Sequence, residues 1–498
     1  MSAQPSIAHP GQSIHLLDLN QDIFQHIVSF LDRPVISILS KTCRSLHNGL
    51  AGQLLRGTVS VRRPLLVAFK DFLDADRSRY EFLKHWKFIT VPHTATYSPS
   101  QVSQDVDVCS ILHASHNLVS LSLDKVTPDH FQPKDLRAVF TAIPQLQELS
   151  LLSVGPKYGD VLHGVLPNLR ILKLDFSTDR LSPLNFLATH RTTLRELTLE
   201  HIWPQATFPP DTHPDPFPSV RRLHLNPISS PSGLSTIARC FPNLDALTLH
   251  TVILDEGWRQ EHGFYAAVLE HDQQGAFAPF ARWYDRTAET VRAAGGTWAR
   301  LATLRALDSV GLFFAPLCCT AERLEVVQAS IMPEQMAHVY RELRPRVVVL
   351  PPESSPNAFL EAARCHLVTL EHAPSVSHLT VRVSSAVVPV LPLDQVLAAL
   401  SQALPRSSVS HLLLELSSLG EFGQSEELKA FYRNASDVMQ LLSSSIPSLR
   451  KIFFDIEGRD LKAWEMDTAG SGAWMEMNEW VALRVISEEG MRDSGRAD

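Results

Sequence analysis

The residues of this chain that are able to do chemistry are its 22 histidines and six cysteines, since imidazoles and thiols bind metals and act as bases or nucleophiles. His201, His224 and His250 fall at different places within successive repeated segments, so they do not converge on one metal ion. The adjacent Cys318 and Cys319 follow the apolar run Leu-Phe-Phe-Ala-Pro-Leu, which favours buried thiols. The chain also lacks a glycine-rich phosphate loop, a Gly-x-Ser-x-Gly turn and a His-Glu-x-x-His motif. We therefore expect no catalytic residue, no metal site and no cofactor.

Polar residues on predicted strands are a better candidate for function. They fall between and just after the last two leucines of a repeated motif in the middle of the chain. The candidate target-binding face consists of Lys173, Asp175, Thr198, Glu200, His224, Asn226, Thr248 and His250. Their mixture of charges, amides and hydroxyls suits recognition of a protein better than a single small-molecule pocket. For any one of them, a solvated strand surface without a partner is the alternative interpretation.

The elements that must position these residues are copies of the motif Leu-x-x-Leu-x-Leu. The motif begins at Leu118, Leu146, Leu169, Leu194, Val220 and Leu244, with 23 to 28 residues between successive starts. Weaker copies begin at Leu304, Val376, Val409 and Leu449, with less regular ones at Ala321 and Pro345. In an extended strand the last two leucines point to one side, and such strands bury that side only by stacking. The spacing is typical of leucine-rich repeats and predicts an α/β solenoid of parallel strands, with helical returns such as Gly233–Cys240 and Asp394–Leu404.

The segment Leu16–Leu46 predicts two short helices that are apolar on more than one side. Asn20 can cap the first helix, and Pro34 suits the first turn of the next. So small a unit seldom builds a sufficient core by itself, and the surplus apolar surface indicates a docking site for another protein. An ordinary helical hairpin that packs on the rest of the chain is the alternative. The first helix carries two apolar rows, Ile23, Ile27 and Phe30 with Leu31, and Phe24, Val28 and Leu31.

The same segment resembles the F-box, the module through which substrate receptors join cullin–RING (SCF-type) ubiquitin ligases. The family positions are matched by Leu19, Ile23, Ile27, Phe30, Leu31, Asp32, Ile36, Leu39, Ser40, Cys43 and Arg44. The segment departs from the family at Asn20, where Pro is usual, at Lys41 and Thr42, which replace apolar residues, and at Leu46, which replaces a common Trp. The resemblance implies that a Skp-family adaptor is bound by Leu19, Ile23, Phe24, Ile27, Val28, Leu31, Ile36, Leu39 and Cys43.

The resemblance also implies a substrate-recognition subunit of an SCF-type ubiquitin ligase. Its partners are then the Skp-family adaptor and cullin at the F-box, and an unknown protein target at the repeats. The chain is then not itself an enzyme, because it acts by holding the target near the ubiquitin-carrying enzyme. The alternative is a non-catalytic scaffold or interaction protein without a ligase role. A hydrolase within Leu249–Leu304 has little support.

Composition and charge narrow the classes of partner. The net charge of −8 over 498 residues argues against a nucleic-acid partner. No run of eighteen apolar residues is present, which argues against a membrane span. The scattered cysteines and a start without signal-peptide character indicate a reduced compartment, so we expect a cytoplasmic or nuclear location, or both.

The expected organisation has five parts. A flexible N-terminus covers 1–14, the F-box covers 15–57, and a linker with the N-terminal cap of the solenoid covers 58–115. The solenoid covers 116–456, and an acidic C-terminal cap and tail covers 457–498. An aromatic-rich insertion at 251–303 is interpreted as degenerate repeats or inserted helices, with a target-binding element as the alternative.

Overall fold

The structure is a computed structural model of the 498-residue chain, and contacts divide it into two compact units, Met1–Leu174 and Asp175–Asp498. In the described part of the chain, no helix combines the length and apolar character needed to cross a membrane. The expected flexible N-terminus at 1–14 and most of the expected insertion at 251–303 lie outside the described residues. The structure describes residues 20–89, 108–124, 131–152, 161–175, 187–200, 215–226, 231–250, 284–285, 288–289, 291–293, 297–307, 312, 317–327, 333–353, 367–384, 393–417, 435–456, 460–467 and 473–492.

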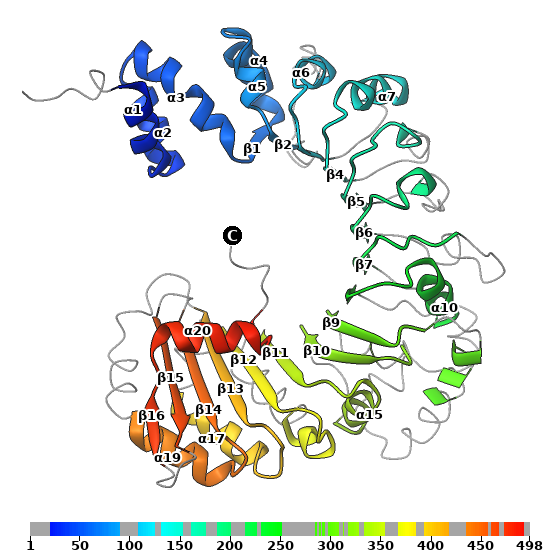
Figure 1. Ribbon diagram of the computed structural model, residues 1–498, viewed down its shortest axis with the longest axis vertical. Coiled ribbons are helices and arrows are strands. Elements are labelled where there is room, and N and C mark those ends of the chain that lie inside the picture. The colour runs from blue at the N-terminus through cyan, green and yellow to red at the C-terminus, as the bar shows by residue number, and fades with distance from the viewer. Residues whose placement is uncertain are drawn as a thin grey trace, which may run out of the picture. The chain divides into compact units, whose positions relative to one another are not determined.

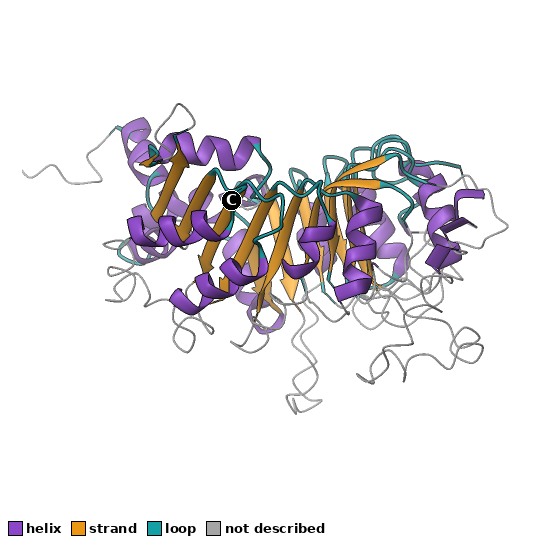
Figure 2. Cartoon of the chain, turned by 90° about the horizontal axis from the view of Figure 1, so that it is seen from below, coloured by secondary structure: helices purple, strands orange, loops and turns teal. Residues whose placement is uncertain are grey.

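The protein is α/β, as predicted, and the sixteen strands of its described residues follow one another in chain order in a long, mostly parallel sheet (Figure 1). In each unit the strands form one layer, and helices lie beside it (Figure 2). This arrangement is consistent with a repeat solenoid, because each strand pairs with the strand of the next copy along the chain.

The first unit starts with three helices and continues with strands that alternate with helices. Its helices are α1 (Gln21–Ser29), α2 (Arg33–Ser40), α3 (Arg44–Arg56), α4 (Leu66–Asp74), α5 (Arg79–Phe82), α6 (Val108–Ala114) and α7 (Pro133–Ala142). Its parallel strands are β1 (Val59–Arg62), β2 (His85–Ile89), β3 (Ser120–Leu123), β4 (Glu148–Leu151) and β5 (Ile171–Asp175), the last of which ends at the unit boundary.

Parallel strands also precede the first copy of the leucine motif. Both β1 and β2 lie in the expected linker and cap at 58–115, yet they pair in parallel with each other and β2 pairs with β3. Trp86 is opposite Leu121 and Phe88 is opposite Leu123. Because Trp86 and Phe88 are buried like the leucines that they face, they are the last two apolar positions of a repeat. Parallel pairing therefore continues N-terminal of residue 116 into the segment expected to be the linker and cap, where Trp86 and Phe88 occupy the positions that leucines occupy in β3.

The second unit continues the same alternation. Its strands are β6 (Glu196–Glu200), β7 (Arg222–Asn226), β8 (Ala246–Leu249), β9 (Arg300–Ala306), β10 (Thr320–Val326), β11 (Val347–Glu353), β12 (His378–Ser384), β13 (His411–Ser417), β14 (Lys451–Ile456), β15 (Asp460–Met466) and β16 (Trp474–Glu476). Its helices are α10 (Pro231–Cys240), α15 (Pro333–Leu343), α17 (Leu393–Ala403), α19 (Ala435–Ser445) and α20 (Glu479–Glu488). Strands β6 to β14 are parallel, whereas β15 and β16 are antiparallel to their neighbours.

The strand register confirms most of the predicted repeats and corrects one. The copies predicted at Ala321, Pro345, Val376, Val409 and Leu449 continue one register through β10 to β14, and the predicted returns coincide with α10 and α17. The copy predicted to begin at Leu304 begins three residues earlier, at Leu301, since Leu304 is opposite Leu247 and Ala306 is opposite Leu249. Ala306 fills the place of the third leucine, so the leucine pattern pointed to the wrong start.

The two sides of the second unit's sheet differ in what covers them. The last two apolar residues of each repeat point into the core, and the residue between them points to the opposite side, which we call the open face. From β10 to β15 this middle position is buried in every strand, although it lies on the open face. In register, it is occupied by Glu325, Val349, Thr380, Leu413, Phe453 and Ala463.

The C-terminal end of the chain covers this part of the open face. We call Glu479–Arg492, which comprises α20 and the four residues after it, the C-terminal strap. Figure 1 shows α20 lying across the strands of this region rather than beyond the last of them. The predicted cap at 457–498 therefore has two parts, because β15 and β16 continue the sheet while the C-terminal strap lies on its face.

Candidate functional site

The first candidate site is the helical module α1–α3 at the start of the described chain. The Asn20 side chain caps α1 by accepting a hydrogen bond from the Asp22 amide at 2.9 Å, as the sequence predicts. Asp32 caps α2 by accepting from the Val35 amide at 3.1 Å, and Pro34 lies in the first turn of that helix. These caps fix where both helices start, and so fix which residues face outward.

The inner sides of α1 and α2 pack against α3. Phe24, Val28 and Ile36 are buried with Leu46 and Leu50 in one apolar cluster. Three residues that the resemblance assigned to adaptor binding therefore form the module's own core, and the structure does not place them on its surface. Leu31 and Leu39 are half-buried against the same cluster. The two apolar rows of α1 indicate this division, because the module needs one row, that of Phe24 and Val28, to form its core.

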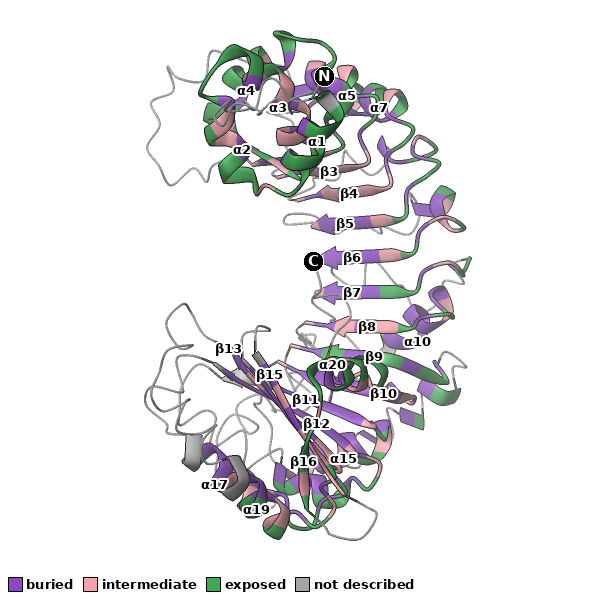
Figure 3. Ribbon diagram, turned by 60° about the vertical axis from the view of Figure 1, so that its left-hand side comes forward, coloured by how far each residue is buried: buried purple, intermediate pink, exposed green. Residues whose placement is uncertain are grey.

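The outer sides of the same two helices carry apolar side chains that the described chain leaves uncovered, and Figure 3 shows exposed stretches on both helices. Ile23 is 52% exposed and Phe30 is 75% exposed on α1 and its C-cap, and Ile38 is 64% exposed on α2. Ile27 and Val35 are exposed beside them. We call Ile23, Ile27, Phe30, Val35 and Ile38 the apolar docking row. Phe30, Val35 and Ile38 are additions to the predicted adaptor-binding residues.

The remaining predicted adaptor residues lie at the ends of the helices. Cys43 is exposed and free, and it precedes α3 without capping it through its side chain. Thr42 is exposed and donates a hydrogen bond from its hydroxyl to the Leu39 carbonyl at 2.8 Å. Leu19 lies outside the described residues.

Two arginines fix the module to the rest of the first unit. The Arg33 guanidinium donates to the carbonyls of Leu54 at 2.7 Å and Thr58 at 2.6 Å, where α3 leaves carbonyls without helical partners. The buried Arg79 donates to the Phe72 carbonyl at 2.6 Å and to Asn48 Oδ1 at 3.1 Å, and its guanidinium lies over the Phe72 ring. Arg33 thereby joins α2 to the C-terminal end of α3, and Arg79 joins α3 to α4.

The second candidate site is the polar strand face predicted from the repeats. Its residues in the second unit are half-buried: Asp175 at the end of β5, and Thr198, Glu200, His224, Asn226, Thr248 and His250 on the open face of β6 to β8 and at their ends. Thr198 is opposite His224, which is opposite Thr248, so the structure brings these three into one row. In the first unit, Lys173 is half-buried and shares a row with Ser150 and Ser122.

The imidazoles of His224 and His250 come closer than their sequence registers indicate. Their ring centroids are 5.4 Å apart in an edge-on arrangement, because the two residues are diagonal neighbours on adjacent strands. His201 lies outside the described residues. Among the residues that the structure describes, no group of three histidines, cysteines or acids is placed to hold a metal ion.

The adjacent cysteines border a cavity of about 410 Å³ in the second unit, together with Tyr284, His338 and Glu342. Burial raises the pKa of the Cys319 thiol to about 12 and also raises the pKa of Cys318. Both thiols are therefore protonated at neutral pH and are poor nucleophiles. Burial raises the pKa of the Glu342 carboxyl to about 7.

No protein-family model matches this chain, and no curated protein matches it. Among solved structures, it is similar to the leucine-rich repeat-containing protein LegL7 from Legionella pneumophila. The identity is 12% and the TM-score 0.35, over 79% of this chain and 97% of that one.

Proposed function

We propose that this chain is a substrate-recognition subunit of an SCF-type ubiquitin ligase. It binds a Skp-family adaptor through α1 and α2 and a protein target through the open face of its repeats. The observation that supports this proposal is the apolar docking row, which lies on the segment that resembles the F-box and is uncovered in the described chain.

The docking row has the physical properties of an interface anchor. Fully covering an isoleucine or phenylalanine contributes about 1.5–3 kcal/mol, so the partly exposed Ile23, Phe30 and Ile38 together contribute several kcal/mol to association. The capped helices already hold these side chains in place, so little conformational entropy is lost on binding.

The departures from the F-box pattern are compatible with this docking mode. Asn20 replaces the usual Pro, but its side chain caps α1, a hydrogen bond that Pro cannot accept through a side chain. Lys41 and Thr42 are exposed at the C-terminal end of α2. This position is at the rim of the proposed interface, where the Lys41 ammonium stays hydrated.

The proposed contribution to ubiquitin transfer is proximity. A target held on the repeats meets the ubiquitin-carrying enzyme at a high effective concentration, so the chain supplies no catalytic group of its own. The module's fixation by Arg33 and Arg79 supports this role, because a mobile receptor would lose most of that advantage.

Binding of a purified Skp-family adaptor–cullin complex to the full chain tests the proposal. Ile27→Asp places a charge in the docking row, and we expect it to weaken binding at least 100-fold. Val67→Asp on α4 is the matched control, because Val67 is 38% exposed and Ile27 is 39% exposed. The control should bind like the unmodified chain. Undiminished binding by Ile27→Asp would refute the docking surface.

The alternative, a scaffold without a ligase role, is favoured by the polar Lys41 and Thr42 at family positions that are usually apolar. Reconstituted ubiquitin transfer to proteins captured on the repeats separates the two functions. A receptor supports transfer that is lost with Ile27→Asp. A scaffold captures the same proteins without transfer.

A further inference from the structure

The C-terminal strap occupies part of the face that the proposed function assigns to the target. In register, the middle position of the repeats runs from Thr248 through Arg305 and Glu325 and on to Leu413 and Phe453. The row is half-exposed or exposed at Thr248 and Arg305 and buried at Leu413 and Phe453. One continuous surface of the second unit is therefore open at one end and covered by its own chain at the other.

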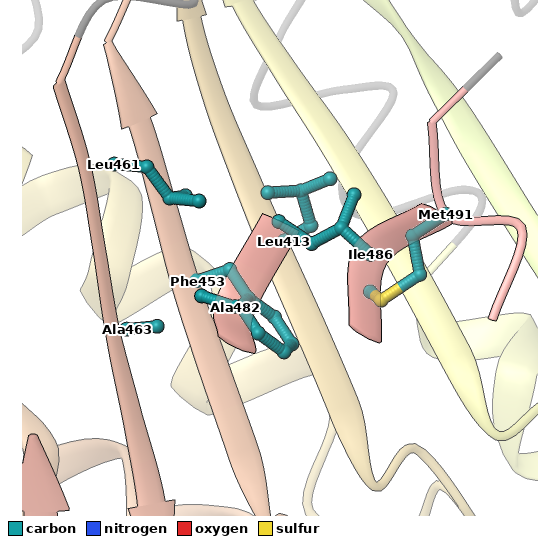
Figure 4. Close-up of a cluster of buried hydrophobic side chains, with 7 residues drawn as sticks. All are labelled: Leu413, Phe453, Leu461, Ala463, Ala482, Ile486 and Met491. Carbon is teal, nitrogen blue, oxygen red and sulfur yellow. The ribbon is translucent and has the colours of Figure 1, made fainter. Parts of the chain in front are cut away.

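The covered end holds the C-terminal strap through apolar contacts. Ala482 and Ile486 of α20 and Met491 pack against Leu413, Phe453 and β15 (Figure 4). Ile486 and Met491 are buried against the sheet, as anchor residues are buried at a protein interface.

The four residues after α20 add a polar latch, Glu489–Arg492. The Glu489 carboxylate pairs with Arg346 and lies 3.3 Å from His378 Nε2. The Met491 carbonyl accepts from the Thr380 hydroxyl at 2.9 Å. The backbone between them turns at Gly490, whose φ of +66° is one that residues with a side chain rarely adopt.

The latch ends in an arginine that meets acidic side chains of the sheet. The Arg492 guanidinium pairs with Asp455 and lies 3.4 Å from Glu415. The sheet therefore offers a cation for Glu489, a hydroxyl donor for the backbone and two carboxylates for Arg492. This is a complementary binding surface for a short peptide.

We propose that the C-terminal strap is a self-ligand of the target face, displaced by a protein segment of the same chemistry. That segment is an amphipathic helix followed by an acidic residue, a glycine turn, an apolar residue and an arginine. This proposal depends on the proposed function at one point only, where the displacing segment is taken to belong to the protein target.

Two features of the C-terminal strap permit its displacement. Both side chains of the Arg346–Glu489 pair are about a third exposed, and such pairs contribute little against solvent. The C-terminal strap is also the last element of the described chain, so its release breaks no strand pairing of the sheet. Its covalent attachment gives it a high effective concentration, so only a segment with comparable contacts competes.

Glu489→Arg in the full chain opens the latch by placing two cations together. The matched double variant Arg346→Glu/Glu489→Arg restores an ion pair of reversed polarity. Arg484→Glu is the control on the outer side of α20, where Arg484 is exposed. The probe is a labelled peptide of residues Glu479–Arg492, measured by fluorescence anisotropy, alongside hydrogen exchange of the α20 amides.

We expect Glu489→Arg to speed exchange of the α20 amides at least tenfold and to raise affinity for the peptide at least tenfold over the unmodified chain. The double variant should restore slow exchange, and Arg484→Glu should change neither quantity. A peptide with Met491→Asp and Arg492→Glu should not bind the opened chain. The proposal is overturned if Glu489→Arg leaves exchange unchanged or if the opened chain fails to bind the unaltered peptide. Adaptor binding at α1 and α2 is measured on the same variants, so a failure of the proposed function is seen separately.

Discussion

The imidazole rings of His378 and His411 stack face to face, with ring centroids 4.2 Å apart and 17° between the ring planes. The two residues are opposite each other on β12 and β13. Burial, the neighbouring His411 and Arg346 lower the pKa of His378 to about 4, and burial and Lys451 lower the pKa of His411 to about 4. Two neutral rings stack without repulsion, so the folded chain resists protonation of this pair.

We expect stability to fall as the pH drops from about 6.5 towards 4. Above pH 6.5 the rings are neutral in both states, but below it the unfolded chain binds protons that the folded chain refuses. The loss of unfolding free energy between pH 6.5 and 4.5 is on the order of 2 kcal/mol for each ring and therefore about 4 kcal/mol for the pair. Urea unfolding at pH 7.0, 5.5 and 4.5 measures it.

Elsewhere in the second unit, burial raises the pKa of Glu342 to about 7, so its protonation stabilises the fold as the pH falls and opposes this loss in the same window. A variant of the pair is therefore needed to isolate the contribution of the two rings. The Arg346 guanidinium lowers the pKa of the Glu489 carboxyl, so its stabilising effect is lost only below the usual glutamate range. Replacing one ring by His411→Phe should remove about half of the contribution that the two rings make to the pH dependence. An unchanged dependence in that variant would show that other groups cause it.

Phe24 and Phe30 should respond oppositely to truncation, although both belong to the same short apolar segment. Phe24→Ala removes a ring from the module's core and should cost about 3–5 kcal/mol of stability. Phe30→Ala removes an exposed ring and should change stability by less than about 0.5 kcal/mol, while weakening adaptor binding. Chemical denaturation and adaptor binding, measured on both variants, separate the two roles. Equal loss of stability in both would contradict the assigned faces of α1.

Arg79→Met should destabilise the first unit by about 2–4 kcal/mol. The substitution keeps most of the side-chain volume but removes the donors to Phe72 and Asn48 and the charge over the Phe72 ring. Exchange of the α3 and α4 amides should accelerate, because this guanidinium joins the two helices. The control is the exposed Arg77, whose change to Met should alter stability by about 0.5 kcal/mol or less. Similar effects at both positions would rule out a bridging role for Arg79.

Arg382 should be more costly to remove alone than together with its partner. Its guanidinium lies 2.7 Å from the buried Glu325 and 2.8 Å from Glu415. Arg382→Met leaves Glu325 buried with only the more distant Arg305 and Arg323, and should cost about 3–5 kcal/mol. Adding Glu325→Leu should recover part of that loss, which urea unfolding of both variants measures. Additive losses would indicate that the pair is not coupled.

Most repeats were predictable because leucine occupies most of the core positions of the strands. At Ala306 a smaller residue fills the place of the third leucine, so the pattern pointed three residues too far along. At Trp86 and Phe88 larger residues fill these positions, so the leucine motif does not mark β2. Register is a property of paired strands, and one strand read alone does not reveal which apolar residues face its neighbour.

The candidate sites were predictable only in part. The Asn20 cap followed from the sequence, but the division of α1 into Phe24 and Val28 inside and Ile23 and Ile27 outside depends on where α3 lies. The C-terminal strap had a local signal. Val349, Leu413 and Phe453 are apolar where the middle position of β3 to β10 is polar, and a strand buried on both sides reads as a continuous apolar run.

The reversal of direction at β15 has a consequence for how the molecule behaves in crowded solution. A parallel array ends in a strand whose backbone groups invite another copy to join, and such edges promote fibre growth. Here the outermost strand β16 has three residues, Trp474–Glu476, and runs against the strand that it borders. So short an edge strand offers a second molecule few backbone partners, so we expect no growth of the sheet from this edge at concentrations where an open parallel edge would polymerise.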